Sequence, residues 1–214
     1  MHSGAHILNK INLVPSKEMF LQGIEEFEKR ERRDPMYKVA SFLVNHSWGR
    51  PPDMADGLGV LLLTWNQAFY RYGIFDFEKL EKCLNDNLAR IESFRGRNIT
   101  GMSDADEQVI RNLFDQLLIA LQIDAGKSRG KKSPVAVAKA LHLLAPSFFP
   151  LWDKEIAEGY RCSYSEKPAE QYILFSKLMR KLAQAVRAYV QRPDKTLLKL
   201  IDEYNYSKFT QEWI

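Results

Sequence analysis

The sequence has few of the residues that build disulfide frameworks or metal sites. Its two cysteines, Cys83 and Cys162, lie far apart and belong to no motif with metal-ligand spacing. The four histidines show no such spacing either. Because structural zinc sites need closely spaced cysteine or histidine pairs, we expect free thiols, no metal and no cofactor.

Long apolar runs are also missing. The most apolar window, Leu58–Leu63, is far shorter than the roughly 20 residues that cross a bilayer. The first ten residues, MHSGAHILNK, contain neither an apolar stretch nor a cleavage-site pattern. We therefore expect no membrane partner and a cytoplasmic protein, associated with the nucleoid if the source is prokaryotic.

The chain does contain enough apolar material for a core, with 45% hydrophobic and 12% aromatic residues, which excludes global disorder. No segment shows the alternation of a strand, whereas helical periodicity and helix-start residues predict about nine helices. They are expected over 17–31, 35–46, 53–72, 76–94, 103–123, 133–145, 154–160, 168–191 and after Pro193. Since no flexible linker divides these segments, we predict an all-α fold in which residues 1–214 form one monomeric, two-lobed unit.

The positive charge is concentrated in one stretch, although the net charge is only +4. Residues 126–133 read GKSRGKKS, with four cations and no acid, between the helices predicted over 103–123 and 133–145. Backbone N–H groups at a helix start and nearby cations bind phosphate, so this turn is a predicted DNA contact. The predicted DNA-binding residues are Gly126, Lys127, Arg129, Gly130, Lys131 and Ser133.

A lysine and an aspartate bracket the helix that follows this turn. Lys132 stands at its start, and Asp153 stands 21 residues further on, where the next helix begins. A neutral lysine amine can attack the anomeric carbon of an extruded nucleotide, and a carboxylate can stabilise the positive charge on the sugar. The residues alone equally allow a surface lysine and an aspartate that only caps a helix.

Several segments resemble the archaeal 8-oxoguanine DNA glycosylases, a divergent branch of the helix–hairpin–helix DNA glycosylases. They are KRERRDPMYKVASFLVNH, the apolar helix around Leu61–Tyr70, GKSRGKKSPVAVAKAL and PLWDKEIA, and they cover roughly residues 25–160 discontinuously. The resemblance implies a two-lobed helical fold with a divergent helix–hairpin–helix and an active site between the lobes, within about 103–160. It implies Lys132 as nucleophile and Asp153 as essential acid, and it matches Lys139 to a second lysine of the family.

One position departs from that family. Its members have a glutamine that reads the oxidised guanine edge directly after the Asp-Pro pair, whereas this chain has Met36, which cannot form that pair of hydrogen bonds. Met36 therefore argues against 8-oxoguanine and leaves another modified base open, including a phage-hypermodified cytosine. Aromatic rings could stack on such a base, and an amide could read it, or these side chains could belong to the core. The predicted base-pocket residues are Met36, Trp65, Asn66, Phe69 and Trp152.

These observations predict a DNA glycosylase, with or without abasic-site lyase activity, that flips a modified base out of double-stranded DNA and excises it. Two alternatives come from other classes of protein. One is a catalytically silent helical DNA-binding module that uses the same basic turn. The other is a helical protein-interaction protein in which the turn is only solvated.

Overall fold

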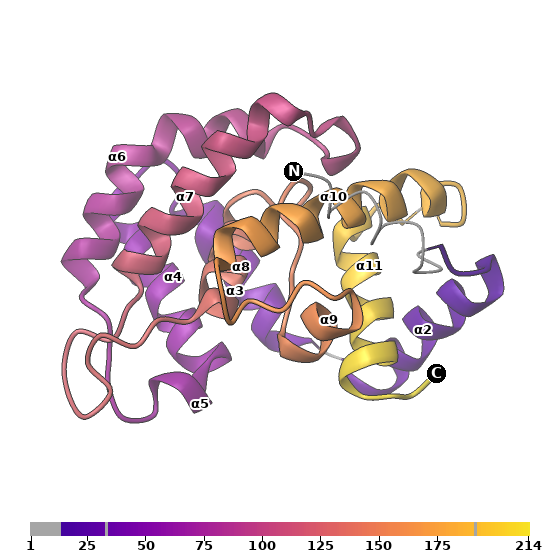
Figure 1. Cartoon of the computed structure of the whole chain (residues 1–214), viewed down its shortest axis with the longest axis horizontal. Helices are drawn as coiled ribbons and strands as arrows, with labels where there is room; N and C mark the ends of the chain where they lie inside the picture. The colour runs from indigo at the N-terminus through magenta and orange to yellow at the C-terminus, as the bar shows by residue number, and fades with distance from the viewer. Residues whose placement is uncertain (1–13, 33, 191) are drawn as a thin grey trace.

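The computed structural model describes residues 14–32, 34–190 and 192–214, and within these ranges it is all-α, with no strand (Figure 1). The α-helices are α2 (Lys17–Arg30), α3 (Pro35–His46), α4 (Pro51–Trp65), α5 (Gln67–Tyr70), α6 (Phe77–Arg95), α7 (Glu107–Ala120), α8 (Pro134–Leu144), α9 (Lys154–Gly159), α10 (Pro168–Val186) and α11 (Leu197–Asn205). Two 3-10 turns, η1 (Ile99–Gly101) and η2 (Asp104–Asp106), precede α7, and a π-helical turn, η3 (Tyr206–Thr210), follows α11. The predicted all-α fold is confirmed. In the described part of the chain, none of the helices combines the length and apolarity that crossing a bilayer requires.

Several helix starts are set by capping side chains. Ser16 Oγ accepts the Met19 N–H at 3.2 Å, and Ser133 Oγ accepts the Ala136 N–H at 3.1 Å. The carboxylate of Asp76 caps α6 in the same way. Each contact satisfies a backbone donor that has no partner inside its helix, so these three predicted starts are confirmed.

Two predicted helices are longer than the observed ones. The segment predicted as one helix over 53–72 is two, because α4 ends at Trp65 and Asn66 leaves the helical conformation, with φ −121° and ψ 33°. The helix predicted over 168–191 ends at Val186. In both cases the apolar pattern continues past the point where the backbone turns.

Two helix starts also differ from the prediction. Asp34 precedes α3 as expected, but its backbone is left-handed (φ 36°) and its carboxylate pairs with Lys199 instead of capping the helix. The last helix begins at Leu197, where Thr196 Oγ1 accepts the Lys199 N–H at 3.1 Å, and not directly after Pro193.

The helices pack in two groups that share one core (Figure 1). Helices α3, α4, α6, α7 and α8 contact one another in the first group. The second group joins α2, α9 and α11 with η3, and α10 contacts both α7 and α11. The two groups face each other across a pocket, and this pocket is the candidate functional site.

Candidate active site

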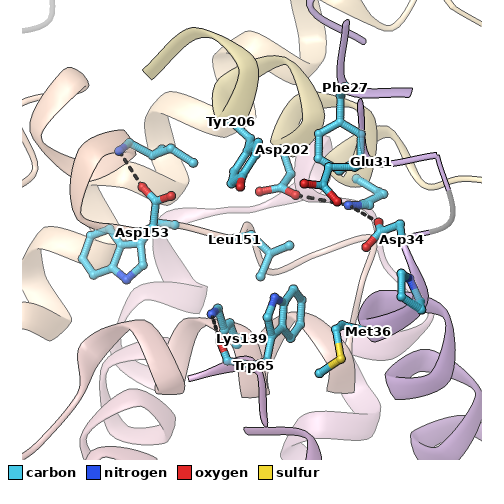
Figure 2. Close-up of a pocket in the computed structure, with 14 residues that line it drawn as sticks. Phe27, Glu31, Asp34, Met36, Trp65, Lys139, Leu151, Asp153, Asp202 and Tyr206 are labelled. Carbon is cyan, nitrogen blue, oxygen red and sulfur yellow. Dashed lines mark hydrogen bonds and ion pairs between the residues drawn. The ribbon is translucent and has the colours of Figure 1, made fainter. Parts of the chain in front are cut away.

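The pocket has a volume of about 330 Å³ and is lined by residues from both helix groups. Figure 2 shows Lys139 and Trp65 on one wall and the carboxylates of Asp202 and Glu31 on the opposite wall. Aromatic rings, carboxylates and a lysine therefore line one space. Because pockets for small ligands span roughly 300–1,000 Å³, this volume suits a single nucleoside-sized group.

Lys139, in the middle of α8, is a lysine of the pocket wall. Its Nζ donates to the Trp65 carbonyl at 2.8 Å and to Asn66 Oδ1 at 3.2 Å, and it lies 4.8 Å from the centroid of the Trp65 ring. Burial lowers the pKa of Lys139 to about 8, although the charges of Asp153 and Asp202 oppose the shift. A neutral amine, which nucleophilic attack requires, is therefore available near pH 8.

Asp153 lies in the same pocket at the start of α9. One carboxylate oxygen accepts the Ile156 N–H at 2.7 Å and so caps the helix, and the other accepts the Thr210 hydroxyl at 2.6 Å. Burial raises the pKa of Asp153, whereas these two hydrogen bonds and the charge of Lys139 act against the rise. The carboxylate is thus a helix cap and a pocket group at once, held in place by η3 from the far end of the chain.

Lys199 is a pocket lysine that the sequence reasoning missed. It is only 3% exposed, and it pairs with Asp34 at 2.8 Å and with Asp202 at 3.4 Å. Its Nζ also lies over the rings of Phe27 and Tyr37, at 4.7 and 4.6 Å from their centroids. Burial would lower the pKa of Lys199, but the surrounding carboxylates outweigh it and raise the pKa. Lys199 therefore stays charged. The sequence feature that could have identified it is a lysine inside the apolar run LLKLI.

Replacing Lys199 by methionine should lower the free energy of unfolding by about 3 kcal/mol, because buried carboxylates would lose their cation. Urea unfolding at pH 7 measures the change. The same substitution at Lys29, whose ion pair with Glu26 is exposed, should leave the stability close to that of the wild type. Equal effects of the two substitutions would contradict a structural role for the Lys199 cluster.

Three of the five predicted base-pocket residues line the pocket, namely Met36, Trp65 and Trp152. Trp152 is only 1% exposed, and most of its indole packs against the core rings Tyr172 and Phe175. Trp65 is half-buried and carries the contact with Lys139. Trp65 therefore offers the more accessible stacking face.

The other two predicted pocket residues take different positions. Asn66 is a bonded structural amide, since its Nδ2 donates to Ser133 Oγ at 3.1 Å while its Oδ1 accepts from Lys139. It ties the end of α4 to the start of α8 and orients the Lys139 amine. Phe69 does not line the pocket, because it packs edge-on against Tyr70 with ring centroids 4.9 Å apart.

Lys132 and Lys139 differ in their access to this pocket. Lys132 is exposed at the end of the basic turn and does not line the pocket. Lys139 follows seven residues later, within α8, and does line it. The geometry therefore brings Lys139, and not Lys132, to the pocket that holds Asp153.

The connection between α7 and α8, residues 121–133, is a closed turn that we call the basic hairpin. Two backbone hydrogen bonds close the turn: the Gly130 N–H donates to the Ile123 carbonyl at 2.7 Å, and the Ile123 N–H donates to the Lys131 carbonyl at 2.9 Å. Asp124, the one acid within residues 121–133, pairs with Lys79. The hairpin cations are exposed and form no ion pair with any residue in the described ranges. They are Lys127, Arg129, Lys131 and Lys132.

Gly126→Ala should destabilise the protein by about 2 kcal/mol or more. Gly126 has φ +84°, and an added Cβ would lie 2.6 Å from the Tyr72 carbonyl oxygen. Gly130→Ala is the matched control, since its φ is +82° but no atom lies within 4 Å of the added Cβ. Urea unfolding should show the larger loss of stability in Gly126→Ala. Equal losses in the two variants would show that the Tyr72 backbone moves away from the added Cβ at little cost.

Comparison of the chain with family models, with curated proteins and with solved structures finds no match. The resemblance to the archaeal 8-oxoguanine DNA glycosylases therefore stays a prediction. Within the described ranges, no cluster of three or more histidine, cysteine or acidic side chains is placed to hold a metal ion.

Proposed function

We propose that this protein is a DNA glycosylase that binds an extruded, modified nucleotide in the pocket and excises its base. The observation that carries the proposal is the placement of Lys139, whose pKa is lowered to about 8, and of the half-buried carboxylate of Asp153 in one aromatic-lined pocket. A base-excising enzyme needs a nucleophile or activated water, a group that stabilises charge on the sugar, and a space for a flipped base. The exposed basic hairpin supplies a surface for the phosphate backbone.

In the proposed reaction, the neutral amine of Lys139 attacks C1′ of the extruded nucleotide. The bond from C1′ to the base breaks, and its electron pair leaves with the base, which takes up a proton. Asp153 stabilises the positive charge that develops on the sugar. Cleavage of the bond from C1′ to the ring oxygen, which takes up a proton, then gives a protonated Schiff base with the lysine, and loss of a proton from C2′ allows β-elimination to release the 3′ phosphate.

This proposal moves the nucleophile from Lys132 to Lys139 and assigns Lys132 to the phosphate-binding cations of the hairpin. If neither lysine attacks the sugar, Asp153 can still activate water in a monofunctional reaction. Met36 lines the pocket without a donor and acceptor pair for an oxidised guanine edge, so the substrate is another modified base, with phage-hypermodified cytosine as a candidate. The partner is double-stranded DNA bound by a cytoplasmic monomer.

Base release from a panel of modified duplexes tests the proposal. The panel contains oxidised purines, hydroxymethylated cytosine and glucosylated cytosine, each assayed with and without borohydride. We expect release from at least one duplex, together with a borohydride-trapped protein–DNA adduct. Release without an adduct would support the monofunctional route.

Two outcomes would contradict the proposal and favour the alternatives. Salt-dependent DNA binding without release of any base would identify a silent DNA-binding module. Absence of DNA binding even at low salt would identify a protein-interaction protein, because the hairpin cations would then only be solvated.

A further inference from the structure

The loop between α5 and α6 lies directly against the basic hairpin. The Asp124 N–H donates to the Ile74 carbonyl at 2.9 Å, and the Tyr72 carbonyl faces Gly126 so closely that a side chain there would collide with it. In Figure 1 the hairpin projects beside the end of α5. Residues 71–74 and the basic hairpin therefore form one composite surface.

Two large apolar side chains are exposed on this surface. Tyr72 is 68% exposed and Ile74 is 44% exposed. Tyr70, two residues before Tyr72, is buried and donates its hydroxyl to the Leu121 carbonyl at 2.8 Å, which anchors the loop. The Tyr72 ring thus stands outside the core on a loop that is fixed at both its sides.

The chemistry around Tyr72 fits nucleic acid better than an apolar protein partner. Exposed Arg71 precedes it, and the hairpin cations lie on the adjoining backbone. A partner for this surface must offer anionic groups next to a flat apolar face. Unstacked nucleotides offer both, because phosphates pair with the cations and a base stacks on the aromatic ring.

We propose that Tyr72 stacks on a nucleobase that is left unpaired beside the extruded nucleotide, while the hairpin cations hold the neighbouring phosphates. This inference rests on the proposed function, since opening the duplex is what exposes such a base. The segment from Trp65 through α5 to Tyr72 links the pocket wall to this surface within a few residues. The surface therefore recognises opened duplex in preference to intact duplex.

Fluorescence anisotropy with two duplexes of the same sequence tests this inference, one intact and one with a three-nucleotide unpaired bubble. We expect the wild-type chain to prefer the bubble and Tyr72→Ala to weaken bubble binding roughly tenfold or more, with less than roughly twofold change on intact duplex. Tyr72→Phe keeps the ring and should retain the preference. Phe42→Ala removes an exposed aromatic of α3 and should leave both affinities unchanged.

Three results would overturn the inference. They are equal binding of both duplexes by the wild type, equal loss on both duplexes in Tyr72→Ala, and a Phe42→Ala effect as large as that of Tyr72→Ala. The readout needs no chemistry, so it is separate from the test of the proposed function. A chain that binds the bubble through Tyr72 but releases no base from any of the modified duplexes would support this surface and refute the glycosylase.

Discussion

Lys139→Gln is expected to abolish borohydride trapping and to slow base release by roughly 10³-fold or more, since glutamine has no amine that can form a covalent bond with the sugar. Glutamine is one atom shorter than lysine, is uncharged and fits the space of the lysine side chain without adding volume, so the fold should persist. The measurement is single-turnover base release from the modified duplex on which the wild-type protein is active. The trapped adduct is quantified on a denaturing gel.

The pH dependence of trapping should report the same amine. Below its pKa of about 8 the Lys139 amine is protonated and has no free electron pair. Raising the pH towards 8 should therefore increase the trapping rate by about tenfold per pH unit, and the rate should level off above pH 8. A rate that falls as the pH rises from 6 to 8 would exclude a neutral Lys139 as the nucleophile.

Lys132→Gln is the matched control, because it makes the same change on the same stretch of chain. It should keep trapping intact, weaken DNA binding on intact and modified duplexes alike, and reduce the slope of log affinity against log salt by about 1. Trapping that survives in Lys139→Gln but disappears in Lys132→Gln would return the nucleophile to Lys132.

Helix starts were predictable because the signal is local. A serine or aspartate with the first turn of its helix satisfies backbone donors within four residues, as Ser133 does for α8. The break at Asn66 was not predictable, because the apolar pattern of the segment continues to Tyr70. At the point where the helix ends, the Asn66 side chain forms hydrogen bonds with two residues that are distant in the sequence, Ser133 and Lys139.

The candidate site was predicted in part for the same physical reason. The sequence places Lys132 just before the predicted helix and Lys139 within it, but which of them reaches Asp153 depends on how α8 packs between the two helix groups. Asp153 could be predicted because it is also a local cap. Lys199 and Thr210 could not be placed at the pocket, since they come from the C-terminal segment and reach it only through the packing of α11 and η3.

Asp153→Asn should reduce base release by roughly 10²- to 10⁴-fold while leaving the fold nearly unchanged. Asparagine is also a good N-cap, so it can still accept the Ile156 N–H, and its amide can donate to the Thr210 hydroxyl. What is lost is the negative charge that stabilises the sugar. Urea unfolding within about 1 kcal/mol of the wild type, measured beside single-turnover base release, separates this effect from misfolding.

The same substitution should move the pH dependence that Lys139 produces. The charge of Asp153 raises the pKa of Lys139, so its removal should lower that pKa and shift the midpoint of residual trapping to lower pH.

Thr210→Val is a control that keeps the Asp153 carboxyl group but raises its pKa. It removes a hydrogen bond that holds down the pKa of Asp153, so the additional loss of activity caused by protonation of Asp153, on the acid side of the Lys139 titration, should begin at higher pH, and Thr210→Ser should restore the wild-type profile. Wild-type base release in Asp153→Asn would remove this carboxylate from the mechanism.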